Sequence, residues 1–258
     1  MPQTSEDPLT NEPPPPVAHQ EIWLEVAQHE PALVWLPETS ERPQPLAVIT
    51  HGAGGTAAAH CRAWRRQLGP RGFLLCLAGR RISNVPGSDA GYFYPDHYAL
   101  EAELLAALSA LTTYFGDDVD AQRALYAGYS QGAEMGAHMI FKHAPRIARI
   151  ALIEGGGSGW NVARAQQFHD AGGERVLFVC GLARCIDDAK NAAGWLKRGN
   201  VDAVAEYAPG AGHTYSGKVA ALISERLPWL LEDDERWSFT PRQPSQVHGL
   251  STQGLPSQ

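Results

Sequence analysis

Short apolar runs alternate with stretches of helical periodicity along most of this sequence. Nearly unbroken apolar runs, such as 46–50 and 147–153, are typical of strands that are buried on both faces of a sheet. The pattern predicts strands over residues 22–26, 32–36, 46–50, 72–77, 124–127, 147–153, 176–180 and 201–208, and helices over 57–68, 98–114, the run after Ser130, 161–171, 187–197 and 218–231. This alternation indicates an α/β fold, in which helices cover both faces of a parallel sheet.

Both ends of the chain depart from this alternation. Residues 1–18 are rich in proline and poor in large apolar residues, and residues 237–258 are polar and rich in Pro, Ser and Gln. We therefore expect a disordered segment at each end of one domain that covers residues 19–236. Within that domain, residues 79–97 form a long loop rich in Gly, Pro and aromatic residues, and loops of this length are usually functional or disordered.

Composition narrows the class of protein. With 44% hydrophobic residues, a chain of 258 residues can bury a sizeable core. The formal net charge of −7 argues against nucleic acid or an anionic membrane surface as the main partner. No apolar run approaches the ~20 residues that span a bilayer, and residues 1–16 lack the basic start and apolar stretch of a secretory signal. We expect a protein that does not insert into membranes and is cytoplasmic by default, whereas a processed or different start would point to a secreted form.

The four cysteines leave the redox state open. Cys61 and Cys76 lie on neighbouring predicted elements, and Cys180 and Cys185 bracket a short predicted loop. Two local disulfides are one interpretation and four reduced thiols are the other, and the sequence does not choose among the three pairings. No Cys/His spacing is typical of a zinc site, so no metal is expected.

The segment around Ser130 carries the strongest chemical signal. An apolar strand runs into Gly128-Tyr129-Ser130-Gln131-Gly132, and a helix-forming run follows at once. This order is typical of a nucleophile elbow, a strained strand-to-helix turn that exposes the serine hydroxyl above the sheet. A bare G-x-S-x-G arises by chance in many glycine-rich chains, so the strand before it and the helix after it make the prediction specific.

A serine hydroxyl needs an adjacent base, which is usually a histidine held by a carboxylate. His213 is the best candidate, because it follows the last predicted strand in a Gly-Ala-Gly-His-Thr turn. In sheets of this kind, catalytic residues lie beyond the carboxyl ends of the strands. His138 and His143 lie on or just past the helix after Ser130, and we interpret them as packing or surface residues.

The glycine-rich segment that follows strand 46–50 is a candidate oxyanion hole. The backbone N–H groups of Ala53 and Gln131 would stabilise the oxyanion of a tetrahedral intermediate, while His51 would shape the loop. The segment lacks the Lys-Ser/Thr ending of a P-loop and the spacing of a dinucleotide fingerprint, so a phosphate site is less favoured.

Together, His-Gly-Ala-Gly-Gly, Gly-Tyr-Ser-Gln-Gly and Gly-Ala-Gly-His-Thr, in this order, resemble the α/β-hydrolase superfamily. They look most like its compact carboxylesterases, dienelactone-hydrolase-like proteins and polyester-depolymerase-like esterases, and the resemblance covers residues 20–232. It implies an eight-stranded, mostly parallel sheet and acyl transfer through an acyl-serine, with Ser130 as nucleophile, His213 as base and no cofactor.

The triad acid is the point at which the sequence departs from that family. The family usually carries an aspartate about three residues after the glycine that ends the penultimate strand, where this chain has Arg184 after Gly181. Asp187 and Asp188 come slightly later, at the predicted start of a helix, where acidic residues also act as caps. Glu154 ends the strand after the elbow helix and is followed by three glycines, so it is our first choice, with Asp187 or Asp188 as the alternative.

Aromatic residues near the expected site are candidates for a substrate pocket, namely Tyr92, Tyr94, Tyr129 and Trp160, although for each residue taken separately packing onto the domain is the favoured interpretation. No insertion is long enough for a large lid, which favours short or accessible acyl groups. The sequence therefore predicts a carboxylesterase-like serine hydrolase that acts on small-molecule esters. A thioesterase or peptidase of the same fold, or a non-catalytic ligand-binding protein, remains as the alternative.

Overall fold

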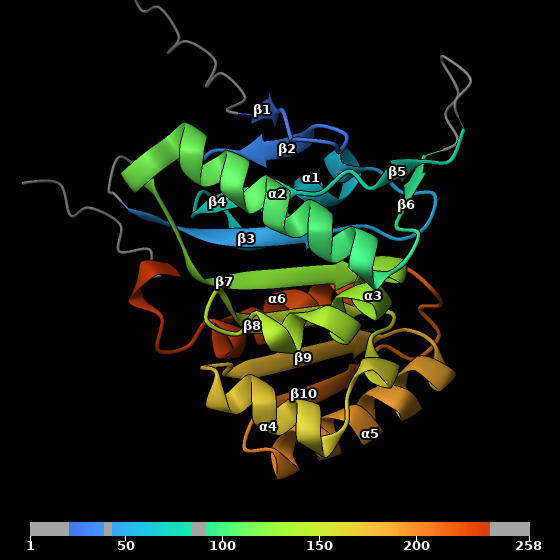
Figure 1. Cartoon of the computed structure of the whole chain (residues 1–258). Helices are drawn as coiled ribbons and strands as arrows, with labels where there is room; N and C mark the ends of the chain where they lie inside the picture. Colours follow the sequence, from blue (N-terminus) through green and yellow to red (C-terminus); the bar gives the residue numbers. More distant parts are fainter. Residues whose placement is uncertain (1–20, 39–42, 84–90, 238–258) are drawn as a thin grey trace, which may run out of the picture.

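The computed structural model describes residues 21–38, 43–83 and 91–237. Eight strands form one sheet in the order β1-β2-β4-β3-β7-β8-β9-β10, and a short ribbon of β5 and β6 stands apart (Figure 1). The strands are β1 (Glu21–Leu24), β2 (Ala32–Trp35), β3 (Gln44–Thr50), β4 (Phe73–Cys76), β5 (Arg80–Arg81), β6 (Tyr92–Phe93), β7 (Val119–Tyr129), β8 (Ile147–Ile153), β9 (Arg175–Cys180) and β10 (Asp202–Tyr207). β2 pairs antiparallel with both β1 and β4, and the remaining neighbours in the sheet are parallel, as predicted.

Helices cover both faces of the sheet. They are α1 (Ala57–Leu68), α2 (His97–Phe115), α3 (Gln131–Met139), α4 (Val162–Asp170), α5 (Ala183–Arg198) and α6 (Lys218–Leu230), with short 3-10 turns at η1 (Gly116–Asp118), η2 (Ile140–Lys142), η3 (Gly157–Gly159) and η4 (Glu235–Trp237). Helices α2 to α5 pack on one face, and α1 and α6 pack on the other (Figure 1).

The two hydrophobic clusters follow directly from strand geometry. Successive side chains of a strand point to opposite faces, so a strand that is apolar at every position supplies both cores. In β3, Leu46 and Val48 belong to the cluster under α2 to α5, whereas Ala47 and Ile49 belong to the cluster under α1 and α6. The unbroken apolar runs of the sequence are therefore strands buried on both faces.

Several boundaries differ from the prediction. Helix α5 begins at Ala183 rather than near residue 187, so Cys185 lies in its first turn instead of in a loop. The long loop contains the two-residue strands β5 and β6, while its residues 84–90 lie outside the described part, and the absence of a large lid stays a prediction. Trp237 is 2% exposed, so the folded domain extends past residue 236. The predicted disordered segments otherwise lie outside the described residues.

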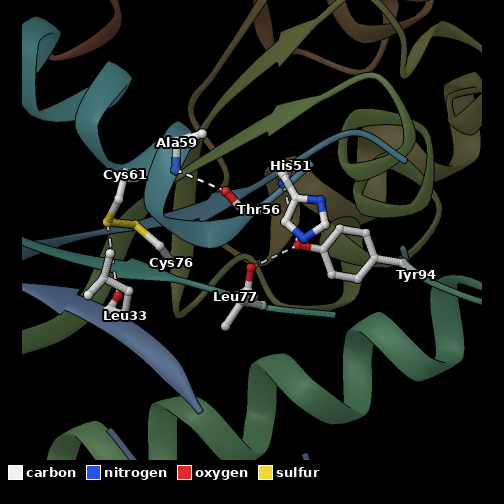
Figure 2. Close-up of a disulfide and its surroundings, with 8 residues drawn as sticks. All are labelled: Leu33, His51, Thr56, Ala59, Cys61, Cys76, Leu77 and Tyr94. Atoms are coloured by element: carbon white, nitrogen blue, oxygen red, sulfur yellow. Dashed lines mark hydrogen bonds between the residues drawn. A yellow bond between two sulfur atoms is a disulfide. The ribbon is translucent and has the colours of Figure 1, made fainter. Parts of the chain in front are cut away.

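Both cysteine pairs form disulfides in the structure. Cys61 in α1 is joined to Cys76 in β4 (Figure 2), and Cys180 at the end of β9 is joined to Cys185 in α5. We expect a thiol titration of the denatured, unreduced protein to find no free thiol, and the same titration after reduction to find four. Because disulfides persist mainly in oxidising compartments, four thiols before reduction would contradict the pairing and agree with the default cytoplasmic location.

A buried arginine ties the end of the described chain to the sheet. The Arg149 side chain in β8 is 1% exposed, and its guanidinium lies 2.6 Å from Oε2 of Glu174 and 3.0 Å from Oδ2 of Asp234. Its Nη2 also donates to the carbonyl oxygen of Glu232 at 3.0 Å. The network thus holds the segment after α6 against the central strands.

Arg149→Ala is expected to lower the free energy of unfolding by about 3 kcal/mol, because it removes the buried partner of two carboxylates. The loss lies at the low end for a broken buried pair, since Asp234 keeps its ion pair with Arg236 and Glu174 keeps its ion pair with Arg123. Denaturant titration followed by circular dichroism measures this change. Arg123→Ala is the matched control, because Arg123 pairs with the same Glu174 from a side chain that is 52% exposed, and such surface pairs contribute about 0–1 kcal/mol. Equal losses in the two variants would contradict the prediction.

None of the helices in the described ranges is both long and apolar enough to cross a bilayer.

Candidate active site

Ser130 sits in a strained turn between β7 and α3. Its backbone has φ 50° and ψ −112°, a conformation that costs a non-glycine residue on the order of 1–3 kcal/mol. Two backbone hydrogen bonds hold the turn: Ser130 N–H donates to Ile153 O at 2.8 Å, and Glu134 N–H donates to Ser130 O at 2.9 Å. This is the geometry of a nucleophile elbow, in which the serine side chain stands beyond the carboxyl end of the central strand.

The two glycines of the motif are required by close packing. A Cβ atom at Gly128 would lie 2.8 Å from the Cα of Ala133, and one at Gly132 would lie 2.5 Å from Oγ1 of Thr50. Real Cβ atoms do not approach other heavy atoms so closely, so side chains at these positions would push β7, α3 and β3 apart. The G-x-S-x-G spacing thus reflects how near the elbow helix lies to the sheet.

The structure brings the candidate base to the serine. His213 follows β10, and its Nε2 lies 2.9 Å from Oγ of Ser130, within hydrogen-bond distance. The His213 side chain is 43% exposed, so this pair faces solvent rather than a closed cavity.

Tyr129 supports the loop that carries His213. Its hydroxyl donates to the carbonyl oxygen of His213 at 3.2 Å, and the two rings lie 5.3 Å apart. The hydroxyl is thus engaged with the protein, while the place of the half-buried Tyr129 ring in the substrate pocket stays a prediction.

Glu154 is the carboxylate nearest the other side of the imidazole. Its side chain is fully buried, and Oε2 lies 3.7 Å from Nδ1 of His213. The second oxygen, Oε1, accepts a hydrogen bond from the N–H of Gly181. Oε2 has no hydrogen-bond partner among the described residues, so it faces the imidazole as an unshared acceptor. Catalytic hydrogen bonds are often long before substrate binds, and 3.7 Å is compatible with such a contact.

The two alternative acids lie on helix α5 and, within the described residues, do not pair with His213. Asp187 and Asp188 are exposed residues within α5, and neither forms an ion pair with His213 in the described structure. Since α5 begins at Ala183, these aspartates are also too far along the helix to cap it, which corrects the explanation suggested by the sequence. The backbone at Gly181 instead approaches the base loop, because a Cβ atom there would lie 2.1 Å from the carbonyl oxygen of Gly212.

The glycine-rich loop after β3 runs beside the serine. A Cβ atom at Gly52 would lie 3.1 Å from Cβ of Ser130, so the backbone leading to Ala53 passes close to this serine. Ala53 itself is exposed, and neither its N–H nor that of Gln131 donates a hydrogen bond to another described residue. Both N–H groups therefore stay candidates for an oxyanion hole. The buried His51 ring holds the loop, because its two nitrogens lie 2.7 Å from the carbonyl oxygens of Gly52 and Ala78.

Solved structures share this architecture. No family model matches the sequence, and no curated protein sequence is similar enough to match. The chain superposes on TT1662 from Thermus thermophilus (19% identity, TM-score 0.57, 82% of this chain and 98% of that chain) and on the Bacillus cereus carboxylesterase (15%, 0.58, 79% and 94%). It also superposes on a carboxylesterase from Mesorhizobium loti (16%, 0.56, 81% and 98%). The protein has the α/β-hydrolase fold.

Within this α/β-hydrolase fold, two of the predicted pocket residues belong to the core. Tyr94 is 1% exposed and stacks on His51 at 4.8 Å, and its hydroxyl donates to Leu77 O (Figure 2). Trp160 is 2% exposed and packs edge-on against Phe168. With so little exposed surface, both side chains belong to the hydrophobic core.

Tyr92 remains near the candidate oxyanion loop. Its backbone N–H donates to Gly55 O at 2.9 Å, its carbonyl oxygen accepts from Gly54 N–H at 2.8 Å, and its hydroxyl accepts from Arg81. This half-buried ring, like that of Tyr129, keeps its predicted place in a wall of the substrate site as a prediction.

Two further aromatic side chains near the base were missed at the sequence level. They are His60 in α1 and Tyr215, two residues after His213. Their ring centroids lie 5.2 Å apart, and each centroid lies 5.3 Å from that of Tyr129. Burial, with a smaller contribution from His51, lowers the pKa of His60 to about 4, so this imidazole is neutral near pH 7. The position of Tyr215 directly after the base loop was the only signal for this cluster.

Proposed function

We propose that this protein is a serine hydrolase that cleaves carboxylic esters through an acyl-serine intermediate. The 2.9 Å contact between Ser130 Oγ and His213 Nε2 carries the proposal, since it pairs a half-buried serine hydroxyl with an exposed base. The buried carboxylate of Glu154 behind the imidazole supports it. The two carboxylesterases among the superposed structures support the choice of ester substrates.

In the first step, His213 Nε2 accepts the hydroxyl proton as Ser130 Oγ attacks the ester carbonyl. The negative charge that develops on the carbonyl oxygen is stabilised by the N–H groups of Ala53 and Gln131. Glu154 accepts from Nδ1 of the imidazolium and stabilises its charge. When the tetrahedral intermediate collapses, the carbon–oxygen bond to the alcohol breaks, and the alcohol takes the proton from His213.

In the second step, His213 removes a proton from water as that water attacks the acyl-serine. A second tetrahedral intermediate uses the same N–H groups, and its collapse releases the acid and returns the proton to Ser130. No metal or cofactor takes part in this scheme. The exposed position of His213 favours short or otherwise accessible acyl groups.

The test is a matched panel of acetyl and butyryl esters, thioesters and amides with the same acyl groups, together with fluorophosphonate labelling mapped by peptide mass spectrometry. Ester turnover and a label on Ser130 are the expected results. Faster turnover of the thioesters or the amides would change the assignment from esterase to thioesterase or peptidase, because the same triad can hydrolyse esters, thioesters and amides. A protein that is neither active nor labelled at Ser130 would be a ligand-binding protein instead.

A further inference from the structure

The segment that follows Glu154 is built almost entirely of glycine. Glu154 has a left-handed φ of 58°, and Gly156, two residues later, has φ 86°. A run of glycines restricts its own backbone little, so other residues must hold this segment in place. Glu154 is itself tied to β9, because its N–H donates to Val179 O at 3.0 Å, and only Gly181 donates to its carboxylate among the described residues. The segment that follows is therefore a second constraint on where that carboxylate points.

Glu134 provides such a hold from the nucleophile's own helix. Its Oε1 accepts a hydrogen bond from the N–H of Gly156 at 2.8 Å, and its Oε2 accepts one from the hydroxyl of Ser158 at 2.8 Å. Its own N–H donates to Ser130 O. One residue therefore contacts both the serine turn and the segment that leaves Glu154.

The Glu134 carboxylate has no Lys or Arg ion-pair partner among the described residues, so hydrogen bonds to the glycine segment are what engage it. A carboxylate accepting two such bonds makes stronger contacts than a neutral acceptor. Glu134 also lies in the first turn of α3, where a negative charge is favourable to the helix dipole. A purely local role in helix stability is the competing explanation.

We propose that Glu134 is a positioning residue for the triad, which holds the Gly155–Gly157 segment so that the Glu154 carboxylate faces Nδ1 of His213. The proposal rests on the proposed function, because it assigns Glu134 an effect on turnover that is exerted through Glu154. Glu134 itself touches neither the serine hydroxyl nor the imidazole.

Two substitutions separate hydrogen bonding from charge. Glu134→Met keeps the length of the side chain and a high helix propensity but removes both acceptors. Glu134→Gln removes the charge yet keeps an oxygen for the N–H of Gly156, and its amide can donate to the hydroxyl oxygen of Ser158. Glu225→Met, at an exposed position of α6, is the matched control for loss of a helical carboxylate.

Glu134→Met is expected to lower kcat for ester hydrolysis between about 10- and 100-fold, because small displacements of a catalytic group have effects of this size. KM should stay within about twofold, since no ground-state contact to substrate is lost. Glu134→Gln should retain most of the wild-type kcat. In a Glu154→Gln background, Glu134→Met should change kcat by less than about twofold, because residues that act through each other are not additive.

Equal kcat for wild type and Glu134→Met would overturn the proposal, as would a full additional loss in the Glu154→Gln background. A loss of kcat in Glu134→Gln as large as in Glu134→Met would identify the charge, not the hydrogen bonds, and would also overturn it. If Glu134→Met does not fold, Glu134→Asp takes its place, because it keeps the charge and withdraws the carboxylate from Gly156. A wild-type protein that shows neither turnover nor labelling overturns the proposed function and this inference together. If the wild type is active, the variants test the role of Glu134 alone.

Discussion

Replacement of Ser130 by alanine is expected to lower kcat for ester hydrolysis by about 10⁴-fold or more, because removal of the nucleophile from such a triad leaves only binding and oxyanion stabilisation. Fluorophosphonate labelling at this position should disappear. The fold should be unaffected, since the Ser130 side chain caps no helix and its backbone hydrogen bonds remain. Initial rates with a p-nitrophenyl ester measure the effect.

Ser224→Ala is the matched control for this experiment. Ser224 lies on α6, and its hydroxyl donates to Gln67, far from the serine turn in the chain and on the opposite helical layer from α3. This variant should keep wild-type turnover. Ester hydrolysis that persists in Ser130→Ala would place the activity in another residue or a contaminant and would end the serine mechanism for this protein.

Glu154→Gln has the second largest expected effect, a fall in kcat of about 10³- to 10⁴-fold, as is typical when the triad carboxylate becomes an amide. The amide would present an N–H group or a neutral oxygen to Nδ1 of His213, so it could no longer stabilise the imidazolium. Gly181 N–H can still donate to the amide oxygen, and the variant should therefore fold.

Asp187→Asn and Asp188→Asn are the decisive comparison for the acid. Both residues are exposed on α5, so each substitution should leave kcat within about twofold of wild type and the stability within about 0.5 kcal/mol. The three variants are assayed side by side at one pH with a saturating ester. Near-complete activity in Glu154→Gln with a large loss in either aspartate variant would reverse the assignment.

Local sequence patterns predicted most of the fold. The run 147–153 is recovered residue for residue as β8, and the helix over 57–68 as α1, because burial on both faces and a side-chain cap at Thr56 are encoded within each segment. The start of α5 was misplaced by four residues, since Leu182 at its cap supplies no side-chain hydrogen bond that the sequence would reveal.

In the candidate site too, some residues could be predicted from local sequence and others only from the packed structure. Gly128, Ser130 and Gly132 are recognisable from sequence alone, because one tight turn imposes their spacing. The choice among Glu154, Asp187 and Asp188 was open, since residues after neighbouring parallel strands all reach the same edge of the sheet. Only the packed structure distinguishes a buried carboxylate 3.7 Å from His213 from two exposed ones.

The sequence by itself therefore determined the α/β layering, the elbow and the order of serine and histidine, because periodicity and tight turns are short-range properties of the chain. Tertiary structure alone decided that Tyr94 and Trp160 are core residues and that the cysteines pair locally. It also decided that the Glu134 carboxylate accepts a hydrogen bond from the segment after Glu154. These features depend on contacts between segments far apart in sequence, whose distances are set only when strands and helices pack around the two cores.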